Sequence, residues 1–351
     1  MQNRPEFIRA AILVEQNKPL VVDNIQLPKN LLPGQVLVKL LTSGICGSQL
    51  GEISGAKGND PYLPHLMGHE GCAEVLDVGE GATNLKIGDK VILHWRKGNG
   101  IQSAPPIYSW NGKKLNAGWV TTFNTHAIVS ENRCTKINTK IDNDLAALFG
   151  CAITTGFGVV ENNAKIKMGD SVVVFGAGGV GLNIIQACSL HSAYPIIAVD
   201  IFDNRLDLAR KFGATHVINT KKKDFLEEIE KLSLKGKLDV FIDNTGNTKI
   251  IETGYELINS FGKLILVGVP RKGSNINIFS LPLHFGKTIV GSHGGECNPS
   301  KDIPRFINIF NQEIAFYKEL ITKRINLDNI NEAFELMKTG STAGRIMIDF
   351  S

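Results

Sequence analysis

The chain has 351 residues, which is long for a single hydrophobic core and favours two domains. Its 43% hydrophobic and 21% charged residues are typical of a globular protein, and a net charge of only +4 argues against a nucleic-acid-binding surface. No apolar stretch approaches the ~20 residues that span a bilayer, and six cysteines without a C-x-x-C pair argue against a disulfide scaffold. We therefore expect a cytoplasmic protein that binds neither nucleic acid nor membrane.

The N-terminal part, residues 1–152, is rich in short strands and turns. Ala10–Val14 is the first predicted strand, and three more are predicted over Val36–Leu41, Cys72–Val78 and Lys90–Leu93. Gly, Pro and Asp residues separate these partly alternating segments. Their spacing predicts an antiparallel, barrel-like domain.

Beyond this point strands alternate with helices, which indicates an α/β domain over residues 153–292. Strands are predicted over residues 172–175, 196–200, 216–218, 238–243, 263–269 and 288–290. The alternation is typical of a doubly wound parallel sheet with helices on both faces. Residues 293–351 break it, with an amphipathic helix near Asn329–Lys338 and a final strand Arg345–Phe350. We expect this last piece to return to the first domain.

A glycine-rich turn follows the first strand of the α/β domain. Val172–Phe175 runs into Gly176-x-Gly178-x-x-Gly181 and then into a helical pattern. Such glycines allow a tight turn, let the backbone approach a pyrophosphate and let the helix pack closely on the strand. Asp200 ends the next strand, where an acceptor for the adenosine ribose hydroxyls belongs. These features together predict a dinucleotide site, the alternative being a glycine-rich turn of another α/β fold.

The same acid bears on the choice of dinucleotide. The negative charge of Asp200 would repel a 2′-phosphate, so we expect NAD to be preferred over NADP. Arg205 is the one nearby group that could soften this preference. The densest basic run, Lys221–Lys223, is predicted to be a solvated surface turn.

Three separated residues have the character of metal ligands. Cys46, His69 and Cys151 would give a tetrahedral zinc two thiolates and one imidazole, with one position left open as in catalytic sites. Taken singly, each has a plainer interpretation. An isolated cysteine is usually a small buried hydrophobic residue, and an isolated histidine is usually a core or surface residue.

The chain resembles the zinc-dependent medium-chain alcohol dehydrogenases almost from end to end. The resemblance rests on Ala10–Leu20, Pro33–Lys39, Gly44–Ser48, Gly68–Gly71, Gly88–Val91, the segment around Cys151, Gly176–Gly181 and Gly344–Ile346. It implies a β-rich, barrel-like catalytic domain of the GroES-like kind and a Rossmann domain, with catalytic zinc at the cleft between them.

The resemblance also implies roles for single residues. Cys46, His69 and Cys151 would hold the zinc, Glu70 would lie behind them, and the Ser48 hydroxyl would bond the alcohol oxygen. Trp95 would line the substrate pocket, although it could equally well only pack its own lobe. The implied cofactor contacts are Thr155, Gly176, Gly178, Gly179, Val180, Gly181, Asp200, Arg205, Val269 and Arg345.

The sequence departs from the family at several positions. Residues His94–Asn116 contain no cysteine where many members hold a structural zinc, so we expect one zinc per chain and a lobe held by Trp95, Tyr108 and Trp110. The remaining cysteines are predicted to be packed or surface thiols. Gln49 replaces an aspartate that lies behind the zinc-bound histidine in the family. Gly51 replaces a histidine of the family's proton relay, and Gly47 replaces an arginine that binds phosphate in some members.

The expected function is hydride transfer between a primary or secondary alcohol and its aldehyde or ketone, with one zinc ion and NAD(H), by a homodimer or homotetramer. A cysteine as the third ligand, followed by Thr154, Thr155 and Gly156, favours the alcohol and formaldehyde dehydrogenase branch over polyol dehydrogenases. A zinc-free quinone or enoyl reductase and a non-enzymatic NAD(H)-sensing protein are the competing hypotheses.

Overall fold

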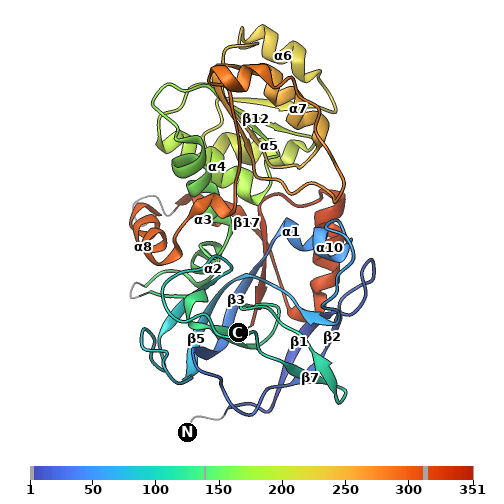
Figure 1. The fold of residues 1–351 in the computed structure, drawn as a ribbon, viewed down its shortest axis with the longest axis vertical. Helices are drawn as coiled ribbons and strands as arrows, with labels where there is room; N and C mark the ends of the chain where they lie inside the picture. The colour runs from blue at the N-terminus through green and yellow to red at the C-terminus, as the bar shows by residue number, and fades with distance from the viewer. Residues whose placement is uncertain (1–3, 138–139, 311–314, 351) are drawn as a thin grey trace. The chain divides into compact units, whose positions relative to one another are not determined.

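The computed structural model describes residues 4–137, 140–310 and 315–350 (Figure 1). The chain divides into two compact units. The first unit comprises Met1–Cys151, Asn298–Ser341 and Arg345–Ser351, and the second comprises Ala152–Cys297 and Thr342–Gly344. Within the described residues, no helix is long and apolar enough to cross a membrane.

The first unit is built on two sheets. A five-stranded sheet has the order β4-β1-β2-β7-β8, with bounds His65–Leu66, Phe7–Leu13, Val21–Gln26, Tyr108–Trp110 and Lys113–Leu115. A seven-stranded sheet has the order β10-β6-β5-β3-β18-β17, with β9 also paired to β3. Its strands are Cys134–Lys136, Lys90–His94, Glu70–Val78, Gln35–Ile45, Arg345–Asp349, Ile321–Ile325 and, for β9, His126–Ser130. All of these strand pairs are antiparallel except the pair of β17 with β18, which is parallel.

Strand β3 runs four residues beyond its predicted end at Leu41. Thr42–Ile45 pair with β18, and Ile45 lies opposite Ile346. A partner strand about 300 residues away in the chain extends β3, and no local pattern could reveal this extension. The pairing brings Arg345 beside the end of β3.

Short helices complete the first unit. They are α1 (Gly47–Ile53), α2 (Asn143–Leu148), α8 (Pro299–Phe310), α9 (Ala315–Leu320) and α10 (Ile330–Thr339). Helix α10 buries Phe334 against Phe123 and Ile348 in one of the hydrophobic clusters of this unit. In the segment predicted to be an aromatic lobe, Tyr108 and Trp110 lie in β7, where Trp110 donates a hydrogen bond to Asp23.

The second unit is a parallel sheet with the strand order β13-β12-β11-β14-β15-β16. In this order the strands are His216–Asn219, Ile196–Asp200, Val172–Phe175, Leu238–Asp243, Ile258–Leu266 and Thr288–Gly291. Its helices are α3 (Ala152–Gly158), α4 (Gly179–Leu190), α5 (Asp203–Lys211), α6 (Phe225–Lys231) and α7 (Thr248–Leu257). Strand β11 is the first in sequence yet lies in the middle, so the strand order reverses between β11 and β14. The predicted Rossmann-type sheet is confirmed.

The strand predicted over residues 263–269 differs from the structure at both ends. Strand β15 begins at Ile258 and stops at Leu266, three residues before the predicted end. The backbone N–H groups of Val267 and Gly268 both donate to the carbonyl of Asp243, which turns the chain away from the sheet. Val269 is consequently 61% exposed.

Candidate metal and cofactor sites

Cys46 is fixed by the junction between a strand and a helix. Strand β3 ends at Ile45, and Cys46 is the extended N-cap residue of α1. Its backbone N–H donates to Oε1 of Gln49 over 2.8 Å, and Gln49 is fully buried. Gln49 therefore uses its side-chain oxygen to hold the backbone of a candidate metal ligand.

Two glycines bring the other candidate ligands into place. Gly68, just before His69, has φ +91°, and a Cβ there would lie 2.7 Å from the backbone nitrogen of Phe123. Gly150, just before Cys151, lies so close to β6 that a Cβ would come within 2.2 Å of the Leu93 carbonyl oxygen. Because only glycine fits either position, both ligand-bearing segments can approach the sheet closely.

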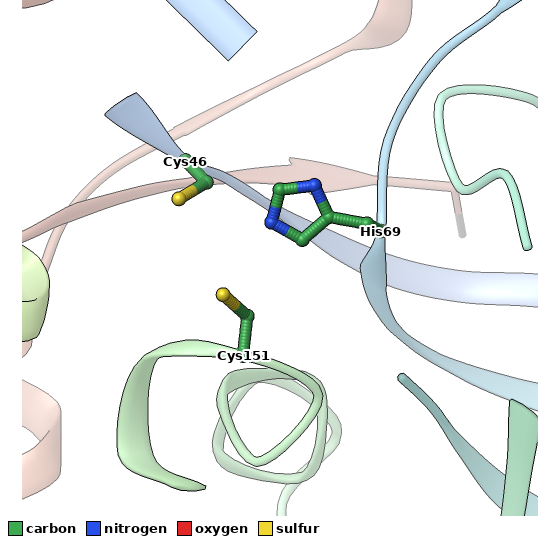
Figure 2. A group of neighbouring side chains, drawn as sticks. All are labelled: Cys46, His69 and Cys151. Atoms are coloured by element: carbon green, nitrogen blue, oxygen red, sulfur yellow. The ribbon is translucent and has the colours of Figure 1, made fainter. Parts of the chain in front are cut away.

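The structure brings Cys46, His69 and Cys151 together in the first unit. Figure 2 shows the two sulfurs and the imidazole pointing toward one another, and the three ligand atoms all lie within 4.8 Å of each other. Tetrahedral zinc with Zn–S bonds of about 2.3 Å would hold two sulfurs about 3.8 Å apart. The donor set and its spacing therefore fit a zinc ion with one open coordination position.

The electrostatics of the cluster also suit a cation. The pKa of the Cys46 thiol lies well below its ordinary value, because Cys151 donates a hydrogen bond to it and Arg345 places a positive charge nearby, which together outweigh burial. The pKa of Cys151 is raised, because its thiol gives that hydrogen bond and is buried. Two sulfurs that share one proton in this way would both be thiolates once a metal ion replaced the proton.

Glu70 and Arg345 form a buried ion pair behind the ligands. Arg345 Nε lies 3.3 Å from Glu70 Oε1, and the same guanidinium donates to Cys46 Sγ over 3.7 Å. Burial lowers the pKa of Arg345, but the charges of Glu70, Cys46 and Cys151 raise it by more. Arg345, which the resemblance implied to be a cofactor contact, thus contacts a candidate metal ligand. Sequence reasoning missed this contact because 299 residues separate Arg345 from Cys46.

The remaining predicted residues of the first unit lie on nearby elements. Ser48 is half-buried in the first turn of α1, two residues after Cys46. Trp95 follows β6 and is half-buried, with the Arg96 guanidinium 5.9 Å from its ring centroid. The cysteines outside the cluster, Cys72, Cys134, Cys188 and Cys297, are all buried, and burial raises the pKa of Cys72 to about 12.

In the second unit the glycine pattern forms the turn between β11 and α4. Gly176 has φ +96°, and a Cβ on Gly181 would lie 2.0 Å from the Gly176 carbonyl oxygen. Gly178 is the N-cap of α4 and faces open space, and Gly179 and Val180 form the first turn of that helix. The turn has the geometry that receives a pyrophosphate at a helix N-terminus.

The other predicted cofactor contacts are only partly gathered around this turn. Asp200 accepts a hydrogen bond from the Ala177 N–H over 2.8 Å, and Arg205 lies 3.6 Å from the same carboxylate oxygen. Thr155 is buried on α3, and Val269 lies exposed after β15. The contacts of Asp200 and Arg205 join the end of β12 to the glycine turn, whereas Thr155 and Val269 lie on other elements.

Comparisons with known proteins agree with this arrangement. The model of the alcohol dehydrogenase GroES-like domain matches residues 32–139, and that of the zinc-binding dehydrogenase domain matches residues 179–312. The chain is 30% identical to the S-(hydroxymethyl)glutathione dehydrogenase of Paracoccus denitrificans, over 97% of this chain and 99% of that protein. It is 31% identical to the enzyme of the same name from Escherichia coli O157:H7, over 95% and 97% of the two chains.

Solved structures give the same result. Benzyl alcohol dehydrogenase from Acinetobacter calcoaceticus superposes with a TM-score of 0.87 at 27% identity, covering 99% of this chain and 100% of that one. An alcohol dehydrogenase zinc-binding domain protein from Burkholderia ambifaria has a TM-score of 0.88 at 26% identity, covering 98% of both chains. The chain belongs to the zinc-dependent medium-chain alcohol dehydrogenase family. It is an oxidoreductase, as its sequence predicted.

Proposed function

We propose that this enzyme is a zinc- and NAD(H)-dependent alcohol dehydrogenase that interconverts a primary or secondary alcohol and its aldehyde or ketone. The observation that carries the proposal is the convergence of Cys46, His69 and Cys151, whose ligand atoms lie within 4.8 Å of one another. A zinc-free reductase would have no use for two thiols and an imidazole converging in this way. We propose one zinc ion per chain.

The bound groups would supply chemistry that amino acids lack: zinc polarises the alcohol oxygen as a Lewis acid, and the nicotinamide accepts the hydride. The protein's own residues would orient the reactants and accept the alcohol proton. Ser48, two residues beyond Cys46, is proposed to hold the alcohol proton at its hydroxyl oxygen. Glu70 and Arg345 restrain the Cys46 sulfur, as residues behind a metal ligand commonly do.

The adenosine half of the cofactor is proposed to bind at the ends of β11 and β12. The free N–H groups at the start of α4 suit the pyrophosphate, and Asp200 lies where the ribose would be received. These positions are at the carboxyl edge of a parallel sheet, next to the reversal of strand order, where such folds bind their ligands.

The proposal is tested by metal analysis and turnover of the purified enzyme. We expect one zinc per chain and alcohol-dependent formation of NADH. Benzyl alcohol and S-(hydroxymethyl)glutathione are the first substrates to try, because similar proteins are named for them. A polyol as the only effective substrate would favour the polyol branch. A metal-free enzyme that reduces quinones or enoyl compounds would overturn the proposal, and NAD(H) binding without turnover of any alcohol would favour a sensor.

We also propose that the enzyme is a homodimer. Among the described strands, β16 is an end strand of the six-stranded sheet, and Phe279, Leu281 and Phe285 are exposed in the segment leading into it. An exposed strand edge beside apolar side chains favours pairing with a second copy. Leu281→Glu with Phe285→Glu should halve the mass in light scattering, whereas Met168→Glu, at an exposed position elsewhere on this unit, should not.

A further inference from the structure

The carboxylate of Asp200 is already occupied by the protein's own backbone. Oδ2 accepts from the Ala177 N–H over 2.8 Å, and Oδ1 accepts from the N–H groups of Ile201 at 2.8 Å and Phe202 at 3.1 Å. The side chain is buried. Much of its negative charge is thus compensated before any ligand arrives, which weakens the expected repulsion of a 2′-phosphate.

Two cations lie against the ring of the neighbouring Phe202. The guanidinium carbon of Arg205 is 4.8 Å from the ring centroid, and Nζ of Lys221 is 4.6 Å from it. Arg205 is also within 3.6 Å of Asp200. The residues come from the end of β12, from α5 and from the turn after β13, so adjacent strands of the sheet bring them together.

Lys221 differs from the two lysines that follow it. Lys222 pairs with Asp203 at 2.5 Å, and Lys223 pairs with Glu228 at 3.1 Å. Among the ion pairs of the described residues, none joins Lys221 to a carboxylate. Around Phe202, Asp200 lies near two cations (Arg205 and Lys221). The adjacent Asp203 is balanced by Lys222, so one positive charge remains in excess.

This excess charge lies where the adenosine of a dinucleotide would bind. The acid that ends the second strand marks the ribose, and a cation nearby is what accommodates a 2′-phosphate. We propose that Phe202, Arg205 and Lys221 bind the adenosine end of the cofactor and accept a 2′-phosphate, so that the enzyme uses NADP(H) as well as NAD(H). Lys221 is the residue that determines this tolerance. The inference rests on the proposed function, which assigns a dinucleotide to this unit.

The test uses NADH and NADPH, which differ only in the 2′-phosphate, and measures their dissociation constants by quenching of protein fluorescence. Turnover is not required. We expect the full-length wild-type protein to bind NADPH no more than about tenfold more weakly than NADH. Loss of one charge-assisted contact in Lys221→Ala should weaken NADPH binding about fivefold or more and NADH binding less than about twofold.

The matched control comes from Lys223. Lys223→Ala removes the same charge from a side chain that pairs with Glu228 on α6, and it should leave the ratio of the two constants unchanged. Binding of NADPH to the wild-type protein more than about tenfold weaker than binding of NADH would overturn this inference and leave the dinucleotide proposal standing. An equal loss for both nucleotides in Lys221→Ala would do the same. If neither nucleotide binds, the dinucleotide proposal itself is wrong, and this inference with it.

Discussion

The guanidinium of Arg345 lies 3.3 Å from the carboxylate of Glu70, and the two side chains are only 4% and 0% exposed. Arg345 begins β18, the last strand of the chain, and Glu70 begins β5 directly after His69. A contact between Arg345 and Cys46 Sγ extends the pair to a candidate metal ligand. The stability of the first unit and the shape of the candidate metal site are therefore coupled through one buried charge pair.

Removing one member of this ion pair should destabilise the folded protein. Arg345→Leu removes the cation that is paired with the buried Glu70 carboxylate, so we expect the free energy of unfolding to fall by about 3–5 kcal/mol. The double variant Arg345→Leu, Glu70→Gln removes both charges and should recover much of that loss. Urea denaturation with excess zinc measures both values. A loss below about 1 kcal/mol in the single variant would contradict a desolvated pair.

The second prediction concerns the three candidate metal ligands, Cys46, His69 and Cys151. Cys151→Ser should lose most of its bound zinc and its activity while it keeps its circular dichroism spectrum, because a hydroxyl is a poor zinc ligand. The matched control is Cys134→Ser, which changes a buried cysteine outside the cluster and should retain one zinc per chain by elemental analysis. Equal zinc content in the two variants, or two tightly held ions in the wild-type protein, would contradict the proposed site.

Local patterns predicted the second unit well because its strands are covered on both faces. Val172–Phe175 and Ile196–Asp200 are continuous buried runs, and the glycines between β11 and α4 have a recognisable spacing. Long-range pairing could not be predicted in the same way. The last residues of β3 are held by β18, and the contact of Arg345 with Cys46 exists only because those strands are neighbours.

The same distinction between local patterns and long-range contacts applies to the candidate metal and cofactor sites. Cys46, His69 and Cys151 follow no spacing rule, so the residues alone could suggest their grouping but not establish it, and the resemblance to a family strengthened the case. The stacking of Lys221 on Phe202 had no signal of its own, because a run of three lysines usually marks a solvated turn. The pairing of β12 with β13 brings the turn after β13 toward Phe202, and the 4.6 Å distance from Lys221 Nζ to the ring centroid shows which of the three lysines faces it.

Proton transfer is predicted to depend on Ser48. Ser48→Ala removes the hydroxyl proposed to hold the alcohol proton, so kcat should fall by roughly 10²–10⁴-fold. Ser48→Thr keeps a hydroxyl at that position of α1 and should stay within about tenfold of the wild-type rate. Deuterated alcohol shows whether hydride transfer limits the rate. If hydride transfer limits the rate and Ser48→Ala still turns over at nearly the wild-type rate, the proposed proton path is excluded.

Gly51 should decide how the proton leaves the site. A Cβ at this position of α1 would come no closer than 3.8 Å to the Cβ of Ala56, so the helix has room for the first atom of a side chain. With glycine here, turnover should rise when small external bases such as imidazole are added. Gly51→His should reduce this response, whereas Gly51→Ala, which fills the same position without a titrating group, should leave it intact.

His94 should make the stability of the protein depend on pH. It is 1% exposed at the end of β6, and its Nδ1 lies 2.7 Å from the Arg96 carbonyl oxygen while Nε2 lies 2.9 Å from the Thr135 hydroxyl. A carbonyl only accepts, so Nδ1 carries the proton and neutral Nε2 accepts from Thr135. Burial, aided by the charge of Arg133, lowers the pKa of His94 from 6.5 to about 4.

Because the folded state binds the His94 proton less tightly than the unfolded state, this residue favours unfolding as the pH falls from about 6.5 to about 4. Between pH 7.5 and 4.5 the wild-type protein should lose about 2–3 kcal/mol through His94, whereas His94→Gln cannot titrate there. The free energy of unfolding of His94→Gln, relative to wild type, should therefore rise by that amount as the pH is lowered. Urea denaturation at the two pH values measures the difference, with His216→Gln, at a half-buried position of the second unit, as the control. A difference between wild type and His94→Gln that stays constant with pH would show that His94 is not held neutral by its surroundings.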